Sequence, residues 1–137
     1  MFLKNTSLLK AWVSAARIRT LPLSVSGILI GSSYAYFLGK FSFSVFVIAI
    51  LTTVSYQLLS NFANDYGDGV KGTDDNRIGP KRTVQSGLIS RVLMKKGMVI
   101  LSLTSSFLTL TLIVLAFGLD SFYVLIFAAL GGLAIFS

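Results

Sequence analysis

Long apolar runs dominate the chain, and one long polar stretch interrupts them. Three runs are long enough to cross a bilayer core of about 30 Å, namely Leu21–Gly39, Phe41–Ala63 and Gly97–Leu119. A fourth run begins at Ser121 and is still apolar at Ser137, with no polar or basic anchor behind it. The pattern predicts an all-α, polytopic transmembrane helical bundle of about four spans. The last span, 121–137, is expected to be cut short, and the alternative is a short final span whose carboxyl end lies at the interface.

The composition agrees with a membrane protein. Of the 137 residues, 54% are hydrophobic and 12% are charged, and the mean hydropathy of +0.80 is high for a soluble domain of this length. The chain has no cysteine, which excludes disulfides and thiolate metal sites. It has no histidine either, so any metal must be held by carboxylate, amide, hydroxyl or backbone oxygens.

The basic residues gather in two segments. Of the twelve in the chain, four fall in the amino-terminal arm and seven in the long loop expected over 64–96. By the positive-inside rule, we expect both segments to face the cytoplasm. The net charge of +7 then reflects membrane orientation and requires no nucleic-acid partner. Within the arm, Ala11–Arg19 suits a helix lying along the interface before Pro22 opens the first span.

The acidic residues are concentrated as well, because four of the five lie within Asn61–Asp75. A helix that continues from the second span would place four oxygen-bearing side chains at i, i+3, i+4 and i+7, on one face: Asn61, Asn64, Asp65 and Asp68. Asp65 and Asp68 would repel each other there, near a helix end that already carries partial negative charge. A cationic partner is therefore expected.

Two kinds of partner fit this face. One is a solvated ion-pair network with the basic side chains of the loop, Lys71, Arg77, Lys81 and Arg82. The other is a divalent ion held by Asp65 and Asp68, with an amide oxygen supplied by one of the two asparagines. A site of oxygen donors alone selects Mg²⁺ or Ca²⁺ over zinc. Since Mg²⁺ is usually shared with substrate phosphates, the neighbouring cations would suit a phosphate-bearing ligand.

These residues form a recognisable motif. The stretch NFANDYGDGVKGTDDNRIGPKRTVQSG, Asn61–Gly87, resembles the first aspartate-rich motif and following loop of the UbiA superfamily of intramembrane prenyltransferases. The segment AARIRTLPLSVSGILIG, Ala15–Gly31, is similar to the first-helix signature of that family. Within the superfamily, the chain most resembles the 1,4-dihydroxy-2-naphthoate polyprenyltransferase branch. The resemblance implies the first part of a nine-helix fold, because the family's second aspartate-rich motif is not in this sequence.

Two positions depart from the family pattern. The superfamily motif N-D-x-x-D-x-x-x-D is met at Asn64, Asp65 and Asp68, but its last place falls on Gly72, two residues before Asp74. Asp74 either takes over the missing role or is part of the loop. In the first-helix signature, Ile18 stands where proline is common.

The resemblance implies a Mg²⁺-dependent transferase of menaquinone biosynthesis in the bacterial inner membrane. It would move a polyprenyl group from polyprenyl diphosphate to 1,4-dihydroxy-2-naphthoate, giving demethylmenaquinone, diphosphate and CO₂. Asp65 and Asp68 are then the expected catalytic residues. The expected metal-binding residues are Asn61, Asn64, Asp65, Asp68 and Asp74. The expected contacts to diphosphate or the aromatic acid are Arg17, Lys71, Arg77, Lys81 and Arg82. We expect the 137-residue chain to be inactive alone, because the second motif is missing.

The sequence also allows an alternative function for the protein and an alternative role for Arg17. A small four-span cation channel or transporter could use the acidic cluster as an ion-selective mouth. Such a protein should carry charged residues within its spans, yet their middles hold no polar residue beyond Ser, Thr, Tyr and Gln57. For Arg17, the alternative to a substrate contact is an interfacial anchor shared with Arg19.

Overall fold

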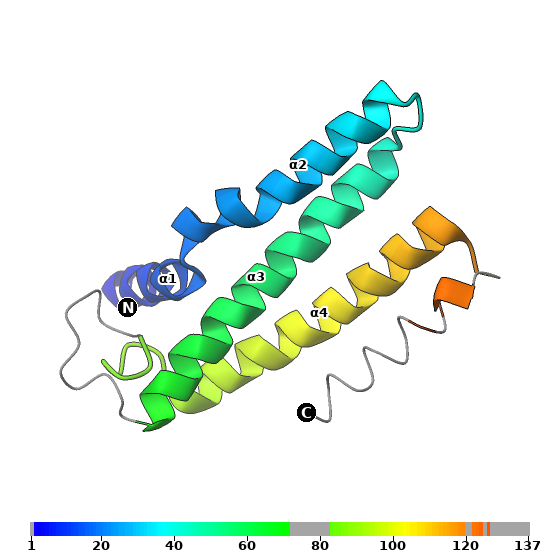
Figure 1. Ribbon diagram of the computed structural model, residues 1–137. Helices are drawn as coiled ribbons and strands as arrows, with labels where there is room; N and C mark the ends of the chain where they lie inside the picture. Colours follow the sequence, from blue (N-terminus) through cyan, green and yellow to red (C-terminus); the bar gives the residue numbers. More distant parts are fainter. Residues whose placement is uncertain (1, 72–82, 120–121, 125, 127–137) are drawn as a thin grey trace.

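The computed structural model confirms the all-α class (Figure 1). It describes residues 2–71, 83–119, 122–124 and 126, without the side chains of residues 2–7 and 71. No strand occurs among these described residues. The elements in chain order are α1 (Phe2–Ala16), the 3₁₀ turn η1 (Ile18–Thr20), α2 (Leu21–Phe37), α3 (Phe43–Lys71) and α4 (Arg91–Phe117).

Three stretches of the described chain are long and apolar enough to cross a membrane: Leu8–Phe37, Phe43–Val70 and Arg91–Phe117. They overlap most of each of the first three predicted spans. In Figure 1, α2, α3 and α4 lie side by side with α3 in the middle, and α3 packs more extensively on α4 than on α2. The α2 helix has 17 residues, about 25 Å, so a full crossing of the bilayer core would also use part of the elbow before it.

Two of the helices extend past the apolar runs. The α3 helix continues to Lys71, and α4 already begins at Arg91, so both ends of the segment expected as a loop over 64–96 are helical. Backbone hydrogen bonding can continue into water once a helix is established, whereas hydropathy marks the part that suits lipid. At α4 the Ser90 hydroxyl accepts a hydrogen bond from the Leu93 N–H at 3.2 Å and caps the helix. The expected fourth span, 121–137, lies almost entirely outside the described residues.

A sharp elbow joins α1 to α2. In Figure 1, α1 is seen nearly end-on, whereas the other helices run across the view. At the elbow Arg17 has φ 47°, a left-handed conformation that a non-glycine residue adopts at a cost of about 1–3 kcal/mol. The Thr20 N–H and hydroxyl both donate to the Arg17 carbonyl, at 2.8 and 2.9 Å, and hold this turn. Pro22, in the first turn of α2, then starts the spanning helix.

The buried core of the described chain lies at the end that carries α1 and the two ends of the long loop. Its members come from α1, α3, α4 and the segment before α4: Ala11, Ala15, Phe62, Val84, Ile89 and Met94. Trp12 packs on Phe62 with ring centroids 5.0 Å apart. Gly97 of α4 makes room for that indole, because a Cβ there would lie 2.8 Å from Trp12. This end is therefore the most firmly packed part of the described chain.

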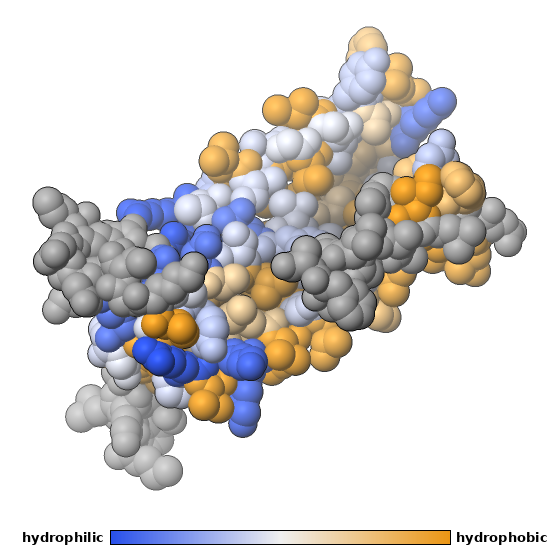
Figure 2. Space-filling view, turned by 60° about the horizontal axis from the view of Figure 1, so that its bottom comes forward, coloured by the Kyte–Doolittle hydropathy of each residue, from blue (hydrophilic) through white to orange (hydrophobic). Residues whose placement is uncertain are grey.

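Hydrophilic and hydrophobic residues are also distributed unevenly between the two ends of the bundle. In the space-filling view, hydrophilic residues gather toward the end with α1 and the loop, and hydrophobic residues cover much of the rest of the visible face (Figure 2). Large apolar side chains such as Leu103 and Phe107 of α4 are exposed, at 68% and 69%. Such exposure suits contact with lipid or with further helices.

Gly97→Ala tests the docking of α1 on α4. The added methyl would meet the rigid indole of Trp12 at 2.8 Å, so we expect a loss of about 1–3 kcal/mol of stability from overpacking. Trp12 is the single tryptophan of the 137-residue chain, so its fluorescence during thermal unfolding in detergent reports this contact directly. Gly27→Ala is the matched control, because nothing lies within 4 Å of its Cβ position. An equal midpoint for the two variants would contradict this packing.

Candidate functional site

The predicted oxygen-bearing face of α3 exists, because the helix runs through all four of its residues. It divides into two neighbouring i, i+4 rows that differ in burial. Asn61 and Asp65 form the inner row, and each is only 3% exposed. Asn64 is exposed and Asp68 is half-buried, so they form the outer row. The two rows therefore have different surroundings and can take different roles.

Asp65 faces the segment that precedes α4, at Thr83 and Val84. Its Oδ2 accepts hydrogen bonds from the Thr83 hydroxyl at 2.6 Å and the Thr83 N–H at 3.2 Å. Its Oδ1 accepts one from the Val84 N–H at 3.2 Å. A buried carboxylate requires such donors to offset its lost hydration. Asp65 thus binds Thr83 and Val84 to α3 in this structure.

Asn61 faces the elbow. Its Nδ2 donates to the Ala16 carbonyl at 2.8 Å and approaches the Thr20 hydroxyl at 3.4 Å, so the amide caps the end of α1. Gln57, one turn earlier, accepts a hydrogen bond from the Ser24 hydroxyl at 2.5 Å and donates to the Asn61 Oδ1 at 3.4 Å. This network ties α3 to the elbow and lies beside Arg17.

Arg17 is half-buried at that elbow, on the same end of the bundle as the oxygen-bearing face. Its position therefore allows a ligand contact near α3 or an anchor at the membrane border. On the other side, the Arg91 guanidinium donates to the Gly69 carbonyl at 3.0 Å and joins the start of α4 to the end of α3. Arg91 was not among the predicted site residues.

Most of the remaining predicted site residues lie outside the described part of the chain. This holds for Asp74, Arg77, Lys81 and Arg82. Lys71 ends α3, but its side chain is not described either. Among the described residues, no three acidic side chains come together as a ready metal cage. A divalent ion at the outer row would therefore need further ligands beyond Asn64 and Asp68.

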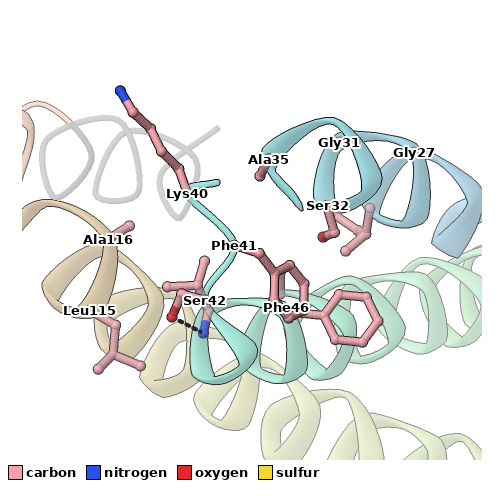
Figure 3. Close-up of a pocket in the computed structure, with 13 residues that line it drawn as sticks. Gly27, Gly31, Ser32, Ala35, Lys40, Phe41, Ser42, Phe46, Leu115 and Ala116 are labelled. Atoms are coloured by element: carbon pink, nitrogen blue, oxygen red, sulfur yellow. Dashed lines mark hydrogen bonds between the residues drawn. The ribbon is translucent and has the colours of Figure 1, made fainter. Parts of the chain in front are cut away.

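A separate pocket of about 470 Å³ opens at the opposite end of the bundle. Figure 3 shows it between the small residues of α2, including Gly27 and Gly31, and the turn into α3 at Phe41, with the end of α4 nearby. Along α3, the pocket residue Phe46 is about 28 Å from Asp65 at 1.5 Å per residue. The pocket is therefore remote from the oxygen-bearing face.

Sequence reasoning missed the partners that divide the face. Thr83 and Thr20 are ordinary polar residues by composition, and neither was singled out. Gln57 carried a usable signal, because a long amide side chain inside an apolar run usually has a partner within the bundle. The signal for Thr83 was weaker, since its partner Asp65 is 18 positions away in the chain.

Known proteins resemble this chain over part of their length. The 1,4-dihydroxy-2-naphthoate octaprenyltransferase of Haemophilus influenzae is 43% identical over 131 residues, which are 93% of this chain and 42% of that protein. The protein of the same name from Escherichia coli is 44% identical over 92 residues, 66% of this chain and 30% of its own length. That of Mycobacterium tuberculosis is 42% identical over 77 residues, 56% of this chain and 26% of its own length. The chain thus spans less than half of the curated relatives it matches.

No family model and no solved structure matches the chain. The match to the Haemophilus protein covers 93% of the chain, so it necessarily includes the second half of α3 and the aspartate-rich loop. Together with three apolar helices of spanning length, it identifies an integral membrane protein.

The two asparagines of α3 provide a matched test of the inner and outer rows. Asn61→Ala removes the donor to the Ala16 carbonyl and leaves the Gln57 amide without one acceptor, so we expect a loss of about 1–3 kcal/mol. Asn64→Ala alters an exposed side chain and should stay within about 0.5 kcal/mol of the parent. Thermal unfolding without metal or substrate measures both. Equal losses would contradict the division into rows.

Proposed function

Because this chain belongs to the family of 1,4-dihydroxy-2-naphthoate prenyltransferases, we propose that its protein transfers a polyprenyl group from polyprenyl diphosphate to 1,4-dihydroxy-2-naphthoate. The products would be demethylmenaquinol, diphosphate and CO₂, because the transfer itself does not oxidise the dihydroxynaphthalene ring. The observation that carries the proposal is the identity of 43% over 131 residues, which takes in the aspartate-rich stretch. No relative reported above is named as a channel or transporter.

Mg²⁺ suits the donor chemistry of the outer row. Asn64 and Asp68 supply an amide and a carboxylate oxygen one helical turn apart, on the accessible side of α3. Mg²⁺ characteristically binds through one or two carboxylates and completes its shell with water and substrate phosphates. The predicted ligand Asp74 could complete the site from the loop. Asp65 and Asn61, also predicted ligands, have oxygens that already accept hydrogen bonds within the protein.

Cleavage of the allylic C–O bond leaves negative charge on diphosphate, which a bound Mg²⁺ would stabilise. Basic side chains would share that task, and the proposed contacts are Arg17, Lys71, Arg77, Lys81 and Arg82. The end of α3 at Lys71 and the elbow at Arg17 both belong to the loop end of the bundle, which supports a common headgroup site. The naphthoate ring would then attack the allylic carbon with water excluded.

The separation of polar and apolar surfaces along the bundle supports an amphipathic substrate. The polar end carries the oxygen-bearing face, whereas the helices beyond it expose apolar side chains. A diphosphate headgroup would bind at the polar end while its isoprenoid tail remains in the bilayer or between apolar helices. The charge distribution supports an inner-membrane orientation in which the arm and the long loop face the cytoplasm.

Asp68→Ala in the complete protein should reduce prenyl transfer at least 100-fold, because the carboxylate would no longer bind the ion that stabilises the leaving diphosphate. Radiolabelled prenyl incorporation into 1,4-dihydroxy-2-naphthoate measures the reaction. Asp120→Asn removes the acidic residue of the sequence that lies outside the aspartate-rich stretch, and it should keep parental turnover and membrane insertion.

Parental turnover by Asp68→Ala at limiting Mg²⁺ would refute the role of Asp68. Failure of the proposed enzymatic activity as a whole is also measurable. If the parent in liposomes passes cations without any polyprenyl diphosphate and does not prenylate the naphthoate, the channel alternative replaces the enzyme.

A further inference from the structure

We propose that Asp65 is a positioning residue that fixes the returning loop to α3, and that the metal is held by the outer row without it. This inference deepens the proposed function and rests on it for its catalytic readout. The family motif pairs Asp65 with Asp68, so sequence alone gives both carboxylates the same task. Their different surroundings in the structure separate them.

The hydrogen bonds of Asp65 leave it poorly placed for a cation. Two successive backbone N–H groups and one hydroxyl point at its carboxylate, with two bonds on Oδ2 and one on Oδ1. Asp65 is 3% exposed, and its partner Thr83 is 2% exposed. A divalent ion at Oδ2 would have to displace a donor, because both lone pairs of that oxygen already accept hydrogen bonds. An ion at Oδ1 would face the Val84 N–H dipole, whose positive end points at the same oxygen.

The segment that Asp65 holds is itself a built turn. The Ile89 N–H donates to the Thr83 carbonyl at 3.1 Å, and the Gly87 N–H donates to the Val84 carbonyl at 3.1 Å. Gly87 has φ 72°, which favours glycine at that point. Ile89 is fully buried and directly precedes Ser90, the cap of α4. The position of Thr83 therefore determines where α4 starts.

A second contact binds the same turn to α3. Val84 packs against Gly69, where an added Cβ would lie 2.7 Å from the Val84 Cγ1, so the valine side chain lies directly on the glycine. Gly69 also offers its carbonyl to Arg91. Both contacts fall one turn beyond Asp65. Together with the carboxylate they fix the rotation of α3 about its own axis relative to the turn.

That rotation has a consequence for the outer row. On a rigid helix, holding Asp65 toward Thr83 places Asn64 and Asp68 to one side of the turn, on the accessible surface. Loss of the Asp65 contact would let this surface shift without removing any metal ligand. The catalytic effect of Asp65 would then appear in the rate at saturating Mg²⁺ and leave the Mg²⁺ requirement unchanged.

A mutant cycle in the complete protein tests this assignment. The variants are Asp65→Asn, Thr83→Val and their combination, with Asp68→Asn as the comparison for a metal ligand. Asp65→Asn turns an amide N–H₂ toward the donors of the turn, and Thr83→Val removes the hydroxyl at nearly constant volume. Thermal unfolding without Mg²⁺ and prenyl transfer as a function of Mg²⁺ concentration are measured for each.

We expect Asp65→Asn and Thr83→Val each to lower the unfolding midpoint, with a double variant less damaged than the sum of the two. Their maximal rates should fall, while the Mg²⁺ concentration for half-maximal rate stays within twofold of the parent. Asp68→Asn should raise that concentration more than tenfold. If Asp65→Asn raises the Mg²⁺ requirement like Asp68→Asn and Thr83→Val changes nothing, Asp65 is a metal ligand and the proposal is overturned.

Two further comparisons cover the cases in which Asp65→Asn does not fold or the parent shows no activity. If Asp65→Asn does not accumulate in folded form, Thr83→Ser, which keeps the hydroxyl, replaces it as the comparison for Thr83→Val. Parental stability for the serine variant and a lower midpoint for the valine variant would support the hydrogen bond, and equal midpoints would refute it. If even the parent shows no prenyl transfer, the proposed function fails, whereas the unfolding cycle still decides whether Asp65 binds the turn.

Discussion

The hydrogen bonds that the Asp65 carboxylate accepts from the Thr83 hydroxyl and from the Thr83 and Val84 N–H groups are the interaction on which the rest of the described structure depends. A carboxylate buried to 3% exposure without donors would be strongly unfavourable, so α3 and the turn must meet here. Their meeting places Val84 and Ile89 in the same buried cluster as Phe62 and sets the start of α4. The charged residue therefore organises the packed end of an otherwise apolar bundle.

The same end also holds the elbow between α1 and α2. The Asn61 amide caps the last carbonyl of α1, and Thr20 holds the left-handed turn at Arg17. Polar side chains of α3 thus reach toward two different segments, one on each side of the helix end. The outer row, Asn64 and Asp68, is the more accessible one, and we propose that it faces a ligand. One helix combines a structural and a proposed catalytic role by dividing its polar residues into adjacent rows.

The sequence predicted the all-α class and three apolar helices of spanning length, because length and hydropathy are sufficient to identify such helices. The fourth expected span lies almost entirely outside the described residues. It located the helix ends less well, since backbone hydrogen bonding carries α3 on to Lys71 after the apolar run stops. The i, i+4 spacing correctly placed the oxygen-bearing side chains on a common helical face. It could not divide that face, because the division depends on Thr83 and Ala16, at separations of 18 and 45 residues from their partners. The metal and diphosphate roles stay predictions.

The most direct measurement is a structure of the complete protein with Mn²⁺ and an unreactive polyprenyl diphosphate analogue, because anomalous scattering locates Mn²⁺ without ambiguity. We predict Mn²⁺ bound to oxygens of Asp68 and Asn64 and to the diphosphate, with Asp65 still accepting hydrogen bonds from Thr83 and Val84. Mn²⁺ bound directly to Asp65, with the turn at Thr83 displaced from α3, would contradict the central claim.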